Sequence, residues 1–319
     1  MTDAQTPTAT PPADSPQPEQ RNAFTARFST GELPVAADRY RLIVADMCPM
    51  SHHALIVRNL LGLDQVIGLG KVDSVRGDRG WQFSADPDGV DPELGIRFLS
   101  EAYFATSPGY DGAVTVPALI DLETGQVVNN DEVYLGNEFE LAWTAYQSPT
   151  APNLYPEPLR KDIDKLNKLL VDELHDGVFR IRGAESQAEY EQSFDRLFAR
   201  MDDLEEQLGN ARYLMGDEIT DPDITLFTVL VRFDIVYNTV FAVNRSRLSD
   251  FPNLWEYARD LFQQPQFGTT TDFESIKRGN ALWNPVQNPH GIIPKGPDVS
   301  GWFVPSRRDE ILHQHHVER

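Results

Sequence analysis

Cysteine is almost absent from this sequence, since Cys48 is the only one among 319 residues. A single cysteine excludes an intrachain disulfide and argues against a small secreted protein held together by such bonds. Apolar runs are also short, and none approaches the roughly 20 residues that a membrane-spanning helix needs. We therefore expect a protein that resides in the cytoplasm and does not bind a membrane.

Basic residues are scarce as well: 28 Lys and Arg stand against 49 Asp and Glu, and the formal net charge is −21. A field of this sign repels nucleic acid and anionic lipid surfaces, so neither is an expected partner. Residues 1–22 are rich in Thr, Pro, Ala and Gln, without a basic start or an apolar stretch. They are predicted to form a disordered tail rather than a signal or transit peptide.

The surroundings of Cys48 favour a reactive thiol. It follows the apolar run 40–47, which reads as a strand, and it precedes Pro49, which is suited to open a helix. A cysteine at this junction lies near unpaired backbone N–H groups and the positive end of a helix dipole. Such a position is expected to lower the pKa of the thiol and to make it a nucleophile. The alternative is a small buried hydrophobic residue.

The chain divides into two folded parts around a Pro-rich linker. The first, residues 35–147, gives the order βαβ and then αββα, with a strand–turn–strand signature around Glu123-Thr124-Gly125. The linker is 148–158, and the helical second part covers 159–283. Residues 284–319 form a Pro- and Gly-rich extension with little periodicity. The predicted fold class is therefore α/β followed by all-α.

Within the second part, Thr220 precedes Asp223 by three residues, the spacing of a helix N-terminal capping box. The apolar helix that follows, over residues 224–240, is predicted to be the central helix of the core.

Several segments resemble the glutathione transferases, and in detail the glutathionyl-hydroquinone reductases of the xi class. The resemblance implies a thioredoxin-like N-terminal domain and a helical glutathione-transferase C-terminal domain, and it spans about residues 35 to 300. The segments that carry it are Cys48-Pro49-Met50-Ser51-His52, Gly80-Trp81-Gln82-Phe83, Thr115-Val116-Pro117, Val128-Asn129-Asn130, Arg212-Tyr213-Leu214, Leu230-Val231-Arg232-Phe233-Asp234 and Asn288-Pro289.

This resemblance implies thiol exchange. The Cys48 thiolate would remove a small thiol from an aromatic thioether or a mixed disulfide, and a second small thiol would resolve the adduct. The absence of a second cysteine fits such a monothiol cycle. No bound cofactor is expected; glutathione or mycothiol would be the co-substrate, and an aromatic or quinone-type small molecule the partner. The resemblance also implies a homodimer, without a sequence feature that marks its interface.

The resemblance also assigns residues to two halves of a site. Val116-Pro117 is expected to be cis, so that the backbone of Val116 can pair with a peptide-like thiol. His52 is expected beside the thiolate. For Arg232 an ion pair with Asp234 or Asp223 is an equal alternative. The thiol-binding residues are Trp81, Val116, Pro117, Asp131 and Glu132, and the pocket residues are Met50, His52, Phe179, Arg232 and Tyr237.

The sequence departs from the family pattern at the recognition surfaces. Met50 replaces a Trp and His53 an Arg, while Phe179 and Asn280 fall where the family has tyrosines. Glu132 stands in place of a Ser that holds the γ-glutamyl carboxylate of glutathione, and like charges there would cost roughly 1–3 kcal/mol.

Two hypotheses follow. The enzyme could use another thiol, such as mycothiol, whose sugar hydroxyls would donate hydrogen bonds to Glu132. Alternatively, the chain could be a non-catalytic binding or scaffold protein with the glutathione-transferase fold. The presence of Cys48, Pro49, His52, Trp81 and Pro117 together favours the first hypothesis.

Overall fold

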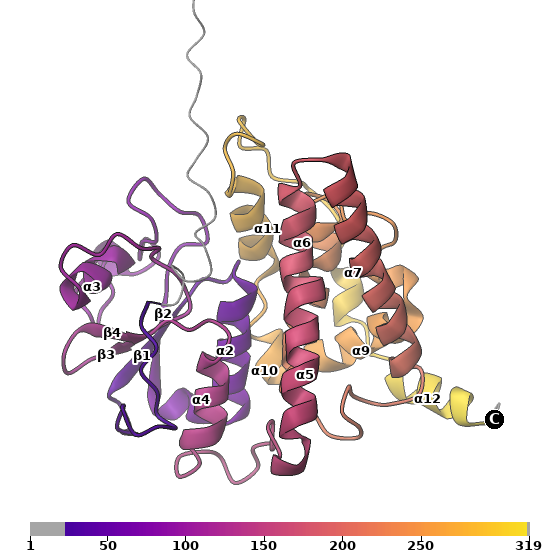
Figure 1. The fold of residues 1–319 in the computed structure, drawn as a ribbon, viewed down its shortest axis with the longest axis horizontal. Helices are drawn as coiled ribbons and strands as arrows, with labels where there is room; N and C mark the ends of the chain where they lie inside the picture. Colours follow the sequence, from indigo (N-terminus) through magenta and orange to yellow (C-terminus); the bar gives the residue numbers. More distant parts are fainter. Residues whose placement is uncertain (1–22, 318–319) are drawn as a thin grey trace, which may run out of the picture.

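The computed structural model describes residues 23–317, so the tail predicted for residues 1–22 lies outside the described part. The N-terminal domain has a four-stranded sheet in the order β2-β1-β3-β4, with helices packed against it (Figure 1). The predicted order βαβ and αββα is confirmed. Its elements are β1 (Tyr40–Val44), α2 (Pro49–Leu60), β2 (Ile67–Lys71), α3 (Leu99–Thr106), β3 (Ala118–Asp121), β4 (Gln126–Asn129) and α4 (Leu135–Ala142).

Strand β1 lies inside the sheet, between β2 and β3, and all five of its residues are buried. It runs parallel to β2, with Tyr40 opposite Ile67, and antiparallel to β3, with Tyr40 opposite Asp121. Mixed pairing of this kind, with a helix crossing between two parallel strands, defines the thioredoxin-like arrangement. Because β1 and β3 are antiparallel, the residues after β1 and those before β3 lie at the same end of the sheet.

The segment before residue 35 also packs on this domain, which the sequence pattern did not indicate. Thr25 forms a β-bridge with Asn129 of β4. The Phe24 ring lies 5.6 Å from the ring of Tyr103 and 5.6 Å from that of Tyr110. The described chain therefore runs along the β4 edge of the sheet, held there by a single β-bridge, before it enters β1.

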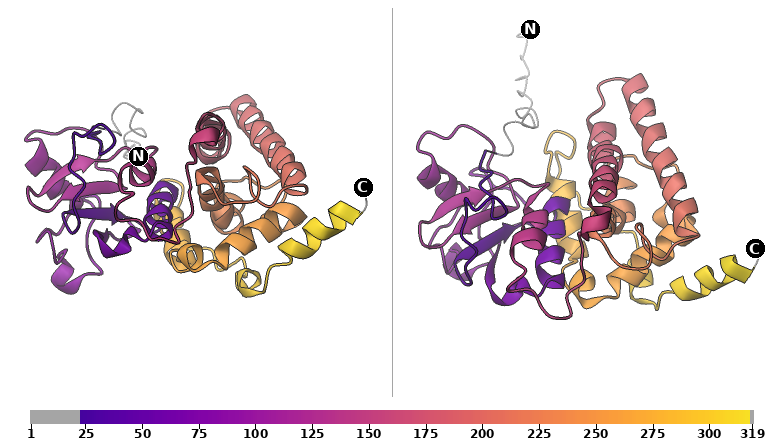
Figure 2. Two further views of the ribbon diagram at one scale, coloured as in Figure 1. Left: turned by 90° about the horizontal axis from the view of Figure 1, so that it is seen from below. Right: turned by 60° about the horizontal axis from the view of Figure 1, so that its bottom comes forward.

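The second domain is helical, as predicted. Its helices stand beside the sheet domain in Figure 1, and Figure 2 shows α12 extending away from the body of the molecule. The extension after residue 283 thus contains a helix that its composition did not predict. The helices are α5 (Arg160–Leu170), α6 (Asp176–Gly183), α7 (Gln187–Leu208), α8 (Asp221–Arg232), α9 (Pro252–Phe262), α10 (Pro265–Gly268), α11 (Phe273–Leu282) and α12 (Arg308–Val317).

Helix α8 is the central helix, since every one of its residues is buried. The predicted capping box is present: the Thr220 backbone N–H donates to Asp223 Oδ2 at 2.9 Å. The apolar stretch continues past α8 as a π-helical turn, Phe233–Tyr237. A helix buried all round fixes its neighbours from both domains.

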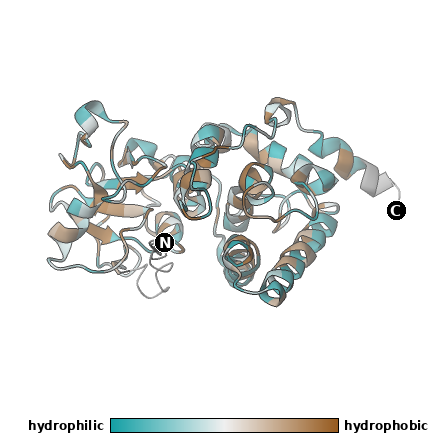
Figure 3. Cartoon of the chain, turned by 90° about the horizontal axis from the view of Figure 1, so that it is seen from above, coloured by the Kyte–Doolittle hydropathy of each residue, from teal (hydrophilic) through white to brown (hydrophobic). Residues whose placement is uncertain are grey.

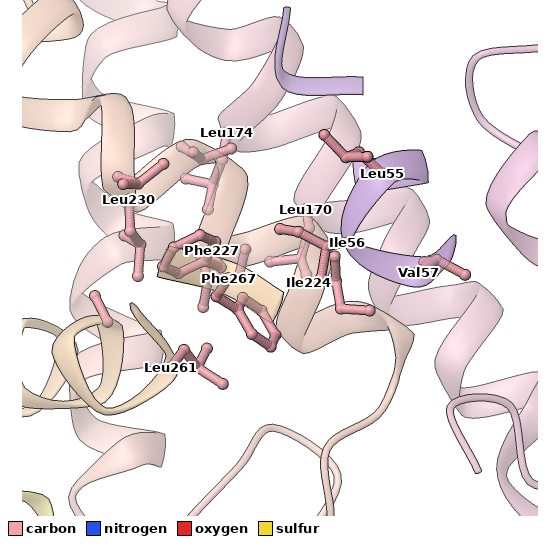
Figure 4. Packing of buried hydrophobic residues seen from close by; sticks show 14 of the residues in the cluster. Leu55, Ile56, Val57, Leu170, Leu174, Ile224, Phe227, Leu230, Leu261 and Phe267 are labelled. Carbon is pink, nitrogen blue, oxygen red and sulfur yellow. The ribbon is translucent and has the colours of Figure 1, made fainter. Parts of the chain in front are cut away.

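One hydrophobic core spans the two domains, and a second, smaller cluster lies within the first domain. Leu55 and Ile56 of α2 lie beside Ile224 and Phe227 of α8, with Phe267 of α10 below them (Figure 4). Figure 3 shows that the outer helices carry both hydrophobic and hydrophilic residues along their length. Because Cys48 directly precedes the first residue of α2, this packing holds the candidate nucleophile against the helical domain. Within residues 23–317, no helix is long and apolar enough to cross a membrane.

Candidate active site

Cys48 is the N-cap of α2, and Pro49 is the first residue of that helix, as predicted. The Ser51 backbone N–H donates to Cys48 Sγ at 3.4 Å, and Sγ in turn donates to the carbonyl of Val116 at 3.5 Å. The Val116–Pro117 bond is cis, which confirms that expectation. The sulfur is therefore held between a helix N-terminus and the backbone that precedes β3.

The expected lowering of the Cys48 pKa is wrong for the protein without ligand. Burial raises this pKa above its ordinary value of 9.0, and the charge of Glu132 raises it further. The N–H group of Ser51 and the guanidinium of Arg232 act in the opposite direction but do not outweigh burial. The sequence could show the helix start, but it could not show how deeply the folded chain surrounds the sulfur.

Arg232 does not line a pocket with its charge, and it pairs with neither Asp234 nor Asp223. Its side chain is fully buried. It donates to the carbonyls of Asp46 at 2.9 Å and Met47 at 3.2 Å, in the turn directly before Cys48. Arg232 therefore positions the nucleophile turn from the helical domain, which corrects both readings of this residue.

His52 is likewise a positioning residue rather than a base. Its Nε2 lies 2.9 Å from Thr270 Oγ1, and its Nδ1 lies 3.1 Å from Arg232 Nη1. Burial, together with the charge of Arg232, lowers the pKa of His52 well below its ordinary range. A neutral ring with both nitrogens in use cannot take the proton of Cys48, so the expectation of a His that activates the thiolate is not met.

Asp131, which was predicted to bind the thiol, forms an ion pair within the protein. The Asp131 carboxylate is 2.9 Å from Arg27 Nη2, and Arg27 comes from the edge segment before β1. Asp131 therefore ties that segment to the start of α4 instead of facing a ligand with its charge. Glu132 is half-buried, and its negative charge reaches Cys48. Of the two acids, only Glu132 is placed to influence the sulfur.

Trp81 is 2 % exposed and lies in the long loop 72–98 between β2 and α3. Sequence reasoning missed two residues beside it. The guanidinium carbon of Arg76 lies 4.4 Å from the Trp81 ring centroid and 4.4 Å from that of Trp283, which follows α11. The charge of Arg76 interacts with that of Cys48. An arginine in a polar loop carries no pattern that distinguishes it from a solvent-exposed one.

Tyr237 is 1 % exposed, and its hydroxyl has no hydrogen-bond partner within the described residues. Burial raises its pKa, and the charges of Arg232 and Cys48 act on it. An aromatic row leads from Tyr237 to the surface: its ring lies 5.4 Å from Phe241, which lies 5.6 Å from Phe179. Phe179 is 40 % exposed, at the outer end of this row. Phe241 was not predicted.

The remaining predicted residues are buried next to the nucleophile turn. Met50, in the first turn of α2, is buried. Asn280, where the family has a tyrosine, is also buried, and its amide donates to Ile276 within α11. Gly279 lets α11 approach closely, since a Cβ there would lie 2.6 Å from Met47 Cβ. Helix α11 thus closes one side of the site.

Chemically, the site presents a thiol with one backbone N–H donor and a carbonyl acceptor, next to a buried phenol and aromatic rings. No group of three His, Cys, Asp or Glu residues suited to a metal ion occurs within residues 23–317. The arrangement can support covalent chemistry at sulfur beside an aromatic ligand.

Comparisons with known proteins agree with this arrangement. Residues 187–260 match the family model described as glutathione S-transferase, C-terminal domain. The chain is 36% identical over 270 residues to the glutathionyl-hydroquinone reductase YqjG of Escherichia coli, a match covering 84% of this chain and 82% of that protein.

Two solved structures are similar over nearly the whole chain. A glutathione transferase from Gordonia bronchialis has 46% sequence identity and a TM-score of 0.88, covering 91% of this chain and 90% of its own. The glutathione-bound structure of Escherichia coli YqjG has 35% identity and a TM-score of 0.83, covering 91% and 96%. A thioredoxin-like domain joined to this helical domain defines the glutathione-transferase fold. The chain belongs to the xi class of glutathione transferases, the family of the glutathionyl-hydroquinone reductases.

Proposed function

We propose that this protein is a cysteine-dependent thiol reductase that removes a low-molecular-weight thiol from an aromatic thioether or a mixed disulfide. The observation that carries the proposal is the position of Cys48 Sγ, between the N–H of Ser51 and the carbonyl of Val116 at the start of α2. Curated relatives named glutathionyl-hydroquinone reductases support the aromatic thioether as substrate class.

In the first step Cys48 attacks the sulfur of the thioether. A Cys48 S–S bond forms, the bond between sulfur and aromatic carbon breaks, and its electron pair leaves with the ring, which takes up a proton to give the hydroquinone. In the second step another thiol attacks the adduct, releasing a symmetric disulfide and Cys48. One thioether and one thiol thus become one hydroquinone and one disulfide. The Tyr237 hydroxyl is the proton donor to the ring.

Binding of the thiol substrate would activate Cys48, because Cys48 donates a hydrogen bond to the Val116 carbonyl in the protein without ligand. An amide N–H of the bound thiol would donate to the Val116 carbonyl in place of Cys48, as the N–H of an added strand does. Cys48 would then lose its acceptor and keep the N–H of Ser51, which favours the thiolate. The raised pKa therefore describes the resting state only.

The thiol itself is proposed to be one without a γ-glutamyl carboxylate, such as mycothiol. Glu132 supports this choice because its negative charge reaches the sulfur. A carboxylate there repels an acidic ligand and accepts hydrogen bonds from sugar hydroxyls. The proposal includes a cytoplasmic location, where small thiols remain reduced, and a homodimer.

The test is turnover of a hydroquinone thioether, prepared with glutathione and with mycothiol, by wild type and Cys48→Ser. We expect hydroquinone release by the wild type, with mycothiol preferred, and none by the variant. Ser249→Ala, at an exposed serine that makes no contact with Cys48, is the control that should stay active. Full activity of Cys48→Ser would refute the covalent mechanism, and inactivity of the wild type with both conjugates would favour a binding protein.

A further inference from the structure

Arg76 occupies an unusual position for a loop arginine. Its guanidinium carbon lies 4.4 Å from each of two indole centroids, Trp81 in the same loop and Trp283 at the end of α11. Trp81 is buried, whereas Trp283 is 43 % exposed, so the stack runs from a buried ring to one that is partly open to solvent. Cations over indole faces are held by the ring quadrupole.

The two elements that bring these residues together are tied at other points. Arg278 of α11 lies 3.0 Å from Asp73, three residues before Arg76. A Cβ on Gly279 would come within 2.7 Å of the Ser74 carbonyl, so α11 and the loop are in close contact there. The position of Arg76 between the rings therefore belongs to a packed interface.

No side chain or backbone group in the described part of the chain forms a hydrogen bond with the guanidinium of Arg76. Within residues 23–317 no carboxylate lies within ion-pairing distance of its guanidinium, although acids outnumber bases in this chain. Desolvation of the guanidinium by the two flanking rings lowers the pKa of Arg76 to about 10, so the group remains charged at neutral pH. The indole N–H of Trp81 is also buried and without an acceptor. The Arg76 side chain is exposed. An exposed guanidinium without an ion-pair partner and a buried indole N–H without an acceptor, both near a reactive sulfur, are suited to an anionic ligand.

We propose that Arg76, Trp81 and Trp283 recognise an anionic substituent, a carboxylate, on the aromatic half of the substrate. A guanidinium binds a carboxylate through two parallel hydrogen bonds, and the indole of Trp283 offers a face to the aromatic ring. The negative charge of Glu132 disfavours an anion on the thiol half of the substrate. We therefore assign the acidic group to the aromatic half. This inference rests on the proposed function and narrows its substrate class to acidic hydroquinone thioethers.

The experiment compares two substrates that differ only in one carboxylate, the thioethers of 2,5-dihydroxybenzoate and of hydroquinone with the same thiol. We expect the wild type to prefer the carboxylated substrate in kcat/KM, and Arg76→Gln to lose about tenfold or more on it, chiefly through KM. The charge of Arg76 also acts on Cys48, and its loss through this route slows both substrates equally. The readout is therefore the ratio of kcat/KM for the two substrates, which should fall about tenfold in Arg76→Gln. A purely structural role of Arg76 would lower activity on both substrates alike and would overturn the proposal.

Arg79→Gln is the matched control, because Arg79 lies in the same loop, 4.0 Å from the Phe98 ring, and its loss changes the net charge equally. It should leave the preference intact. A second readout does not depend on turnover: calorimetric binding of 2,5-dihydroxybenzoate should be weakened by Arg76→Gln and unchanged by Arg79→Gln. If wild type turns over neither thioether, the proposed function fails while this binding result still decides the inference. Equal binding by wild type and Arg76→Gln would refute it.

Discussion

Two opposing effects act on the thiol of Cys48, and only one of them could be predicted from the sequence. The position before Pro49 marks a helix start, and the N–H of Ser51 does donate to the sulfur. Burial depends on Val116 and Arg232, which are 68 and 184 residues away in the chain, and it outweighs that donor. The contacts of Arg232 with the carbonyls before Cys48 likewise depend on how the domains dock, which no local pattern contains.

The first prediction concerns the pH dependence of this thiol. Since the Cys48 pKa is raised above 9.0, the thiolate fraction at pH 7 should stay below about 1% in the protein without ligand. The rate of alkylation by iodoacetamide should therefore still rise with pH above 9. A rate that reaches its plateau near pH 7 would mean that the thiol is already ionised in the resting protein.

Tyr237 supplies a second prediction. Because its hydroxyl has no partner within the described residues, Tyr237→Phe should leave thermal stability unchanged or slightly higher. Loss of the proton donor to the leaving ring should lower kcat roughly 100-fold, with KM nearly unchanged. Steady-state kinetics with a hydroquinone thioether measures both constants. An unchanged kcat would show that the proton comes from elsewhere.

Among the elements, α2 and α11 decide the shape of the site. The capping residues and periodicity of α2 and α8 predicted these helices well, because both signals are local. The approach of α11 to the nucleophile turn was not predictable, because Gly279 gives no sign of what it faces. A Cβ at this position would lie 2.6 Å from Met47 Cβ and 2.7 Å from the Ser74 carbonyl.

The prediction is that Gly279→Ala forces α11 away from the turn before Cys48. Overpacking of this kind costs about 1–3 kcal/mol, and it should also lower kcat/KM because the turn shifts. Gly183, at the end of α6, has open space around its Cβ position, so Gly183→Ala is the control. Urea unfolding and turnover give the two readouts. If Gly279→Ala retains wild-type stability, the close packing of α11 is not what the structure indicates.

For the whole molecule, a buried polar network joins the domains behind the site. His53 Nε2 lies 2.8 Å from Asp221 Oδ1, and Asn167 donates to the other oxygen of Asp221 at 2.5 Å. Glu140 of α4 belongs to the same group: burial, and then the charge of Asp221, raise its pKa well above its ordinary range. No local sequence pattern indicates this network, since its members come from four separate helices.

This network predicts a pH dependence of stability. With its pKa raised, folded Glu140 holds a proton that the unfolded chain releases above about pH 4.5, so stability from this group is lost as pH rises. Glu140→Gln mimics the protonated form and should stabilise the protein at pH 8 but not at pH 4.5. Exposed Glu157→Gln is the control. Urea unfolding measures the free energy of unfolding at each pH. The same change caused by Glu140→Gln at pH 8 and at pH 4.5 would contradict this account.

The most direct measurement of the central claim is the intact mass of the reduced protein after incubation with oxidised glutathione or oxidised mycothiol, compared with Cys48→Ser. The account predicts one mycothiol adduct per chain on wild type, little glutathione adduct, and none on the variant. A glutathione adduct alone would contradict the assignment of Glu132 to a different thiol. No adduct with either disulfide would contradict the role of Cys48 as the nucleophile.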